Sequence, residues 1–250
     1  MTPEYIIQLL FSAVAAMIAL TVHEYCHGYA AYRLGDDTAR NFGRLTLNPL
    51  KHIDVYGAIC MIFFHIGWAK PVPINARNFK NPKRDFAITA VAGPAANLIL
   101  GFFTIPFFLL AFNVYFDLYL KALGSGGFEL NLWRNLAIFL KAFYSINIGL
   151  GLFNLLPIPP FDGSRLLNVF LPPKTYFEIM KYERKIYYGV LALLLLGHYI
   201  TDALRMIPLV SNNSILYFVA GIFSLSDNIA TVIGWVTNAM TAFWELFPFL

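Results

Sequence analysis

The sequence has few charged residues. Only 13% of its 250 residues are Asp, Glu, Lys or Arg, whereas 58% are hydrophobic, and an ordinary soluble domain has about a quarter of its residues charged. This composition excludes a typical soluble domain. It predicts one polytopic membrane domain over residues 1–250, with room for about five transmembrane helices of about 20 residues each.

The sequence also has few cysteines, and it has no basic residues at its N-terminus. The two cysteines, Cys26 and Cys60, lack C-x-x-C spacing, so neither a disulfide framework nor a redox motif is indicated. The chain begins MTPEY, with an acid where a secretory signal has basic residues, so we expect the first apolar segment to remain in the mature protein. The net charge is +4, but the basic residues lie in short loops between apolar runs. The expected partner is therefore the lipid bilayer and not nucleic acid.

The apolar residues group into five segments that we expect to be membrane-spanning helices. They cover about 5–34, 86–113, 132–156, 186–204 and 215–243. Half of the 18 Lys and Arg residues lie from Arg33 to Arg84, at the end of the first segment and before the second, which places that side in the cytoplasm under the positive-inside rule. The sequence thus predicts an all-α, multi-pass protein of the cell membrane with an external N-terminus.

Residues 55–74 lie within that basic region but are apolar. They are too short and too broken by Gly and Pro to span a bilayer, and their Val, Ile and Phe content favours strands. We predict a small β-hairpin inserted at membrane level after the first helix, which is possible only where protein or water covers its backbone.

Residues 23–27 read HEYCH inside the first apolar segment. On an α-helix, His23 and His27 are one turn apart on the same face and can bind one metal ion, with Glu24 beside them. This is the H-E-x-x-H pattern of zinc peptidases. Ionisable residues are costly at membrane depth and indicate a functional site; the alternative is a histidine pair that is hydrogen-bonded within a helix bundle.

A catalytic zinc site needs a third protein ligand. Asp162 follows the third apolar segment in the stretch NLLPIPPFDG and is expected on the same side of the membrane as His27. The prolines interrupt the helix, and Gly163 permits a tight turn that would direct Asp162 inward. Asp162 is either this ligand or a helix cap. In a different membrane zincin, Glu178 or Glu183 would supply the third ligand.

Five motifs in this order then carry a family resemblance: HEYCHGYAAYRLGD, LNPLKHID, GWAKPVPIN, AGPAANL and NLLPIPPFDG. Together they resemble the site-2 protease family of intramembrane metalloproteases, in its small prokaryotic form without a PDZ domain. The resemblance implies one Zn²⁺ per chain held by His23, His27 and Asp162, with Glu24 as the catalytic glutamate and the active site toward the cytoplasm. It implies a catalytic core over about 5–167, followed by accessory helices over about 183–248.

The predicted function is an intramembrane zinc endopeptidase that cleaves transmembrane protein substrates within or near their membrane segments, as in regulated intramembrane proteolysis. Zinc lowers the pKa of its bound water and Glu24 accepts the proton. Asn97, in the AGPAANL motif, either donates to the substrate or oxyanion or ties two helices together. We also hypothesise that the hairpin offers a strand edge to an unwound substrate. A transporter or metal sensor lined by the same residues is the alternative function.

Three further histidines are ambiguous. His52 and His65 flank the predicted hairpin and either contact the substrate or pack locally. His198, among leucines, is either a packed histidine or a ligand. The sequence leaves the substrate and the oligomeric state open.

Overall fold

The computed structural model describes residues 2–54, 57, 69–121, 127–216, 221 and 225–247, and the elements there are helical. The main helices are α1 (Pro3–Arg33), α4 (Pro82–Lys121), α5 (Phe128–Asn154), α6 (Gly163–Phe170), α7 (Pro173–Lys181), α8 (Glu183–Arg205) and α11 (Leu225–Trp244). Shorter helical turns are α2 (Thr38–Asn41), η1 (Pro49–Lys51), η2 (Ala76–Asn78) and α9 (Pro208–Ser211). The predicted all-α architecture is confirmed for this part of the chain.

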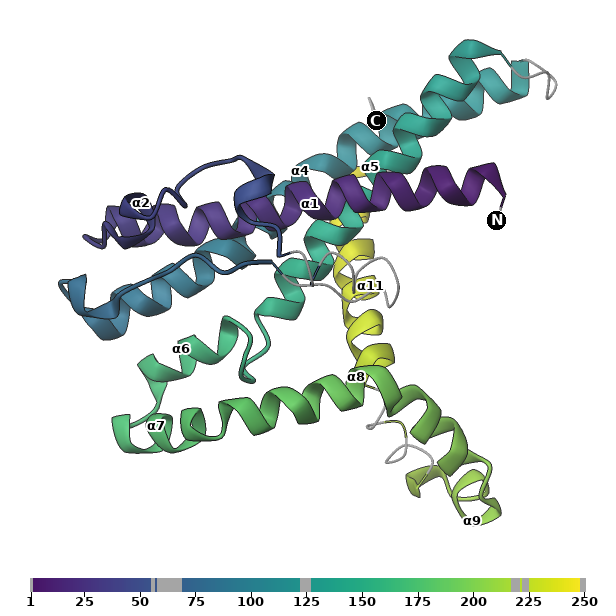
Figure 1. The fold of residues 1–250 in the computed structure, drawn as a ribbon. Coiled ribbons are helices and arrows are strands. Elements are labelled where there is room, and N and C mark those ends of the chain that lie inside the picture. Colours follow the sequence, from purple (N-terminus) through teal and green to yellow (C-terminus); the bar gives the residue numbers. More distant parts are fainter. Residues whose placement is uncertain are drawn as a thin grey trace.

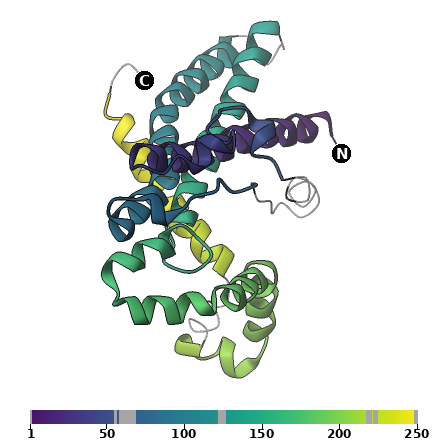
Figure 2. The same ribbon diagram turned by 60° about the vertical axis from the view of Figure 1, so that its left-hand side comes forward.

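The helices form two groups. α1, α4 and α5 pack against one another, and α6, α7 and α8 lie together on one side of them, as both ribbon views show (Figures 1 and 2). α11 contacts α8 as well as α4 and α5. The end of α5 leads into α6. The two groups therefore meet where α5 approaches α1.

The number of membrane spans is lower than expected. Among the described residues, three helices are long and apolar enough to cross a bilayer, namely α1, α4 and α5. α8 qualifies only as a bent pair, Glu183–Leu194 and Tyr199–Arg205, whose halves meet at 60°. α11 contains Asp227, Asn228 and Asn238 and does not reach the same hydropathy. The expected five spans are not confirmed; the described chain has three, or four if α8 is counted.

The predicted β-hairpin is not confirmed either. Residues 55–68, except Gly57, lie outside the described residues, and no strand is assigned elsewhere in the described chain. Its two flanks are described: Ile53 and Ala69 form an isolated antiparallel bridge, and the Lys70 amide donates to the His52 carbonyl at 2.8 Å. The two flanks of this segment therefore lie side by side.

Close approach of α4 and α5 depends on two glycines. A Cβ at Gly101 would lie 2.6 Å from Ile148 Cγ1, and one at Gly151 would lie 2.8 Å from Leu98 Cγ. Small residues at helix interfaces let backbones approach in membranes, where apolar burial alone gives little driving force. These glycines hold α5, and hence the segment after it, close to α4.

Proline inside α4 creates a backbone acceptor without a helical donor. Pro106 lacks an N–H, so the carbonyl of Phe102 four residues earlier loses its helical hydrogen bond. The indole Nε1 of Trp244, near the end of α11, donates to that carbonyl at 2.9 Å. Because an unpaired backbone group is costly in lipid, this contact stabilises the attachment of α11 to α4.

Candidate metal centre

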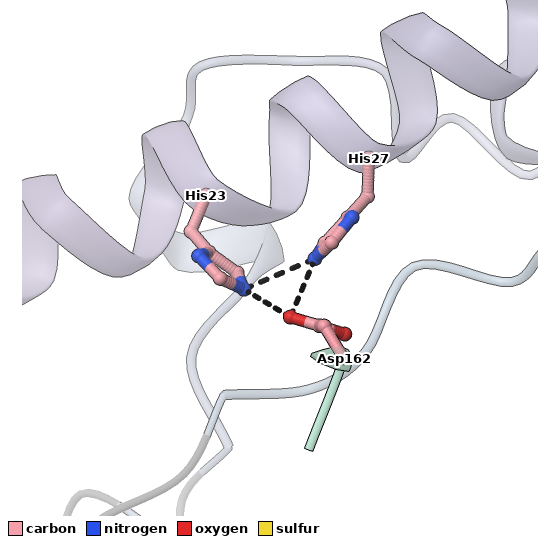
Figure 3. Close-up of side chains that lie close together, drawn as sticks. All are labelled: His23, His27 and Asp162. Carbon is pink, nitrogen blue, oxygen red and sulfur yellow. Dashed lines mark hydrogen bonds and ion pairs between the residues drawn. The ribbon is translucent and has the colours of Figure 1, made fainter. Parts of the chain in front are cut away.

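The two histidines of HEYCH and Asp162 lie together. His23 and His27 project from one face of α1 and are 5% and 6% exposed, while Asp162 precedes α6 (Figure 3). The Nε2 atoms of the two imidazoles are 3.0 Å apart. Oδ2 of Asp162 lies 3.1 Å from Nε2 of His23 and 3.2 Å from Nε2 of His27. The structure thus brings together the three residues that the sequence suggested as ligands.

The hydrogen bonds at the opposite side of each ring define the tautomers. Nδ1 of His27 lies 2.7 Å from the Thr89 carbonyl, which can only accept, so Nδ1 carries the proton. Nδ1 of His23 lies 2.6 Å from Oδ1 of Asn97. The orientation of the Asn97 amide is fixed because its Nδ2 donates to the Ala19 carbonyl at 3.1 Å. Both Nε2 atoms therefore direct lone pairs toward Asp162 when the rings are neutral.

Two imidazole lone pairs and a carboxylate oxygen converge on one point, and in neutral rings none of these atoms carries a hydrogen to share. A cation between them removes this repulsion. Zinc bound at about 2.0–2.1 Å in tetrahedral geometry separates its ligand atoms by about 3.3 Å, close to the separations of 3.0–3.2 Å found here. Two imidazoles and a carboxylate form a donor set typical of catalytic zinc, so the residues fit the ion.

Asp162 occupies the N-cap position of α6, but its side chain makes no capping hydrogen bond. The carboxylate instead extends to the histidines. α5 ends at Asn154, and the proline-rich stretch before Asp162 is non-helical, as expected. Gly163 is required for a different reason than predicted: an added Cβ would overlap the carbonyl of Leu155. Because Gly163 has no Cβ, the chain can fold back closely and bring Asp162 to α1.

Glu24 lies beside the ligands and is oriented by the segment 71–74. Its Oε2 accepts a hydrogen bond from the Val72 amide at 2.8 Å. The preceding carbonyl, of Lys70, accepts from Nη2 of Arg44 at 2.5 Å, which fixes the segment in place. Glu24 and the three candidate ligands line a cavity of about 320 Å³. The carboxylate therefore faces space that a substrate can occupy next to the metal centre.

Comparison with known proteins then decides the family. The profile described as "Peptidase family M50" matches residues 11–197. The chain belongs to peptidase family M50. The predicted resemblance to the site-2 proteases is thereby confirmed, and the chain is a zinc metalloprotease with zinc as its metal.

Relatives in this family carry matching names. "Putative zinc metalloprotease YwhC" of Bacillus subtilis is 38% identical over 186 residues, which is 74% of this chain and 79% of the relative. "Putative zinc metalloprotease Rip2" of Mycolicibacterium smegmatis is 29% identical over 163 residues, or 64% of this chain and 56% of the relative. Rip2 of Mycobacterium tuberculosis is 28% identical over 165 residues, with the same two shares. No solved structure matches.

The alternative third ligands lie elsewhere. Glu183 pairs with Arg165 at 2.7 Å, and Glu178 is exposed on α7. In the described chain, the group of residues able to hold a metal consists of His23, His27 and Asp162. This geometry favours Asp162 as the M50 ligand.

Asn97 is completely buried behind the metal centre. Its Oδ1 faces His23, and its Nδ2 donates both to Ala19 and to Oδ1 of Asn147 at 2.8 Å. Asn147 on α5 is itself held by the Phe143 carbonyl at 2.8 Å. The network joins α1, α4 and α5, and it uses both hydrogens of the Asn97 amide.

The sequence reasoning missed Thr89 and Asn147, whereas the family resemblance placed Gly93 beside the site through its motif. Thr89 acts through its backbone carbonyl, for which the sequence carries no signal. Gly93 allows α4 to approach the imidazole rings, and only its place in AGPAANL pointed to it. Asn147 is a polar residue in an apolar helix, and that rarity was the available signal.

Of the three remaining histidines, the structure describes the side chain of His52. His52 is buried, and its Nε2 donates to the Thr46 carbonyl at 2.8 Å, as in the packing alternative. His65 lies outside the described residues, and the side chain of His198 is not described.

Proposed function

We propose that this M50 chain is an intramembrane endopeptidase in which His23, His27 and Asp162 hold the zinc and Glu24 is the general base. The observation that supports this most strongly is the convergence of two Nε2 atoms and one carboxylate oxygen at 3.0–3.2 Å from one another. Both imidazoles belong to a helix that is apolar enough to span a bilayer. A transporter has no need for a carboxylate such as Glu24 beside paired imidazoles.

The bound zinc would polarise the scissile carbonyl and lower the pKa of the attacking water. Glu24 takes the proton from that water and returns it to the leaving nitrogen, so the peptide bond breaks to give a carboxylate and an amine. The Val72 amide holds Oε2 of Glu24, which leaves Oε1 as the atom for proton transfer.

Asn97 is a positioning residue in this scheme. Because Ala19 and Asn147 accept its two amide hydrogens, it has no donor left for a substrate or an oxyanion. Asn97 instead keeps the proton of His23 on Nδ1, and the Thr89 carbonyl does the same for His27. Partners of this kind raise the basicity of a ligand and fix its orientation.

The substrate we propose is a membrane-protein segment that unwinds at the site. Hydrolysis needs a free peptide carbonyl, and unwound backbone in a bilayer needs hydrogen-bond partners. Segment 71–74 lines the cavity. Pro71 and Pro73 have no N–H, and the Val72 N–H is used by Glu24. This edge therefore offers carbonyl acceptors to substrate N–H groups, which refines the strand-edge hypothesis.

The active site is proposed to face the cytoplasm of a cell membrane. His23 lies ten residues before Arg33, the end of α1, or about 15 Å along the helix. The stretch from Arg33 to Arg84 carries half of the basic residues, which favours the cytoplasm under the positive-inside rule. Water reaches the ligands through the cavity beside Glu24. We retain residues 5–167 as the proposed catalytic core.

The test uses the full chain purified in detergent and reconstituted with a transmembrane substrate. Zinc content and cleavage are measured for wild type, Glu24→Gln and Asp162→Ala. We expect Glu24→Gln to keep one zinc per chain but to lose cleavage by at least ~100-fold, as for loss of a general base. Asp162→Ala is expected to lose zinc. Glu178→Gln is the matched control and is expected to behave as wild type. Wild-type cleavage by Glu24→Gln would reject the proposed mechanism.

A further inference from the structure

A second cavity adjoins the metal centre. It has a volume of about 280 Å³ and lies between α1, α5 and α8. It shares His23, Glu24 and Asn154 with the cavity that contains the three ligands. The two spaces therefore meet at His23 and Glu24, called here the catalytic pair. Beyond this junction, the second cavity is lined by apolar and aromatic side chains.

One face of α8 forms a wall of this cavity. The lining residues from α8 are Tyr187, Val190, Leu191 and Leu194. They follow the i, i+3, i+4, i+7 spacing of a single helical face. Val190 is only 8% exposed. Outside this face, Leu196 is 54% exposed and does not line the cavity, so the wall is a specific stripe of α8.

The other walls come from the catalytic helices and the turn before Asp162. They are formed by Leu20, Leu150, Phe153, Pro160 and Phe161. The rings of Phe153 and Phe161 pack with centroids 4.3 Å apart, so this part of the wall is well packed. The result is an apolar compartment with Glu24 and His23 at one end.

An ion pair fixes α8 relative to the metal centre. Nη2 of Arg165, three residues after Asp162, lies 2.7 Å from Oε1 of Glu183 at the start of α8. Both side chains are partly shielded from solvent. The segment that carries the third ligand thus also sets the position of the cavity wall.

We propose that this cavity is the specificity pocket for the enzyme, and that it receives an apolar side chain of Leu or Phe size from one of the two residues flanking the scissile bond. This inference rests on the proposed function. A peptide bond attacked beside Glu24 lies at the junction of the two cavities, so an adjacent side chain reaches the apolar one directly. Continuity with the catalytic pair favours a substrate side chain over a lipid chain as the occupant. α8, beyond the motifs of the catalytic core, then determines which bonds are cut.

The main test changes the size of the pocket. Val190→Phe places a ring in the cavity, and Leu194→Ala enlarges it; Leu196→Phe is the matched control on the exposed side of α8. Each variant is given a transmembrane substrate with Ala, Leu or Phe at either flanking residue, and products are identified by mass spectrometry. Because a methylene in an apolar pocket changes selectivity by about 10–200-fold, we expect Val190→Phe to shift the preference from Phe toward Ala by ~10-fold or more. Leu194→Ala should shift it the opposite way.

A second measurement does not depend on cleavage. The Glu24→Gln chain is mixed with a substrate that carries a photoreactive phenylalanine analogue at the flanking residue. We expect cross-links within residues 187–194, and fewer in the Val190→Phe variant. Zinc content of each variant reports whether its site is intact.

The outcomes separate the two levels of inference. If wild type cleaves and Glu24→Gln does not, but both pocket variants keep the wild-type preference and cross-links map elsewhere, the pocket assignment is wrong and a lipid chain is the better occupant. If wild type does not cleave, or Glu24→Gln cleaves equally well, the proposed function fails and the pocket assignment fails with it.

Discussion

Gly93→Ala is expected to weaken zinc binding without unfolding the protein. A Cβ at this position of α4 would lie 2.5 Å from Nε2 of His27, 2.8 Å from Cε1 of the same ring and 2.9 Å from Cε1 of His23. Ordinary contacts of a Cβ begin at 3.4 Å. The His27 ring must therefore move by about 0.9 Å, whereas zinc sites hold their ligand distances within about 0.2 Å.

The affected atoms are ring atoms and not backbone, so the rings can rotate away at modest cost to folding. Overpacking of this kind costs about 1–3 kcal/mol. The substitution affects zinc affinity more than folding, because Nε2 of His27 is a proposed ligand atom. We expect a fall of at least ~10-fold in zinc affinity, the lower end of what disturbed ligand orientation produces.

The assay is the zinc content per chain after equilibration with buffered zinc, measured together with the thermal unfolding of the same samples. Gly149→Ala on α5 is the matched control, since its nearest atom, Cδ1 of Ile233, would be 3.7 Å away. A Gly93→Ala chain that retains wild-type zinc affinity would refute the assignment of these rings as ligands held against α4.

Three further predictions follow from the contacts around the site. Asn97→Ala should lower zinc affinity by about 10–100-fold, measured by competition with a chelator, because the proton of His23 is no longer held on Nδ1. Trp244→Phe should destabilise the protein by about 1–3 kcal/mol in detergent unfolding, because the carbonyl of Phe102 loses its donor. Pro106→Ala restores a helical N–H that can donate to this carbonyl. If Trp244→Phe destabilises the Pro106→Ala variant as much as it destabilises the wild type, this account is contradicted. Burial raises the pKa of the Asp36 carboxyl, but hydrogen bonds from residues 38, 75 and 78 outweigh this and lower its pKa below the ordinary 3.8. The ionised Asp36 carboxyl therefore stabilises the folded protein fully above pH 3.8, and this stabilisation is lost as the pH falls through the lower pKa of the folded state. Unfolding measurements should show that Asp36→Asn destabilises the protein at pH 7 and does so progressively less below pH 4.

Much of the site was predictable because helix geometry is regular. Two histidines four residues apart share a face of any α-helix, so His23 and His27 needed only the helix, which the apolar sequence supplied. Asp162 required a topological argument, since it lies 135 residues after His27. Prolines after α5 and the expected side of the membrane together limited where it could lie.

Other features depend on packing that no local pattern records. The hydrogen bond from His27 goes to a backbone carbonyl, which every residue has, so Thr89 carried no distinguishing signal. Gly163 was predicted to matter for its backbone freedom, but its role is close contact with Leu155. The predicted fifth span is not confirmed by the described α11. Asp227 and two asparagines lower the hydropathy of this helix, and an average over the longer apolar segment conceals that effect.

The long separation in sequence between the ligands affects how the protein matures. A chain inserting into the bilayer from its N-terminus places both imidazoles there well before the carboxylate is synthesised. Until residue 162 has emerged and docked against α1, the nascent protein lacks one of the three proposed zinc ligands. With Asp162 as the proposed third ligand, we expect newly made molecules to be inactive during their own insertion, and fragments that end before this residue to remain inactive.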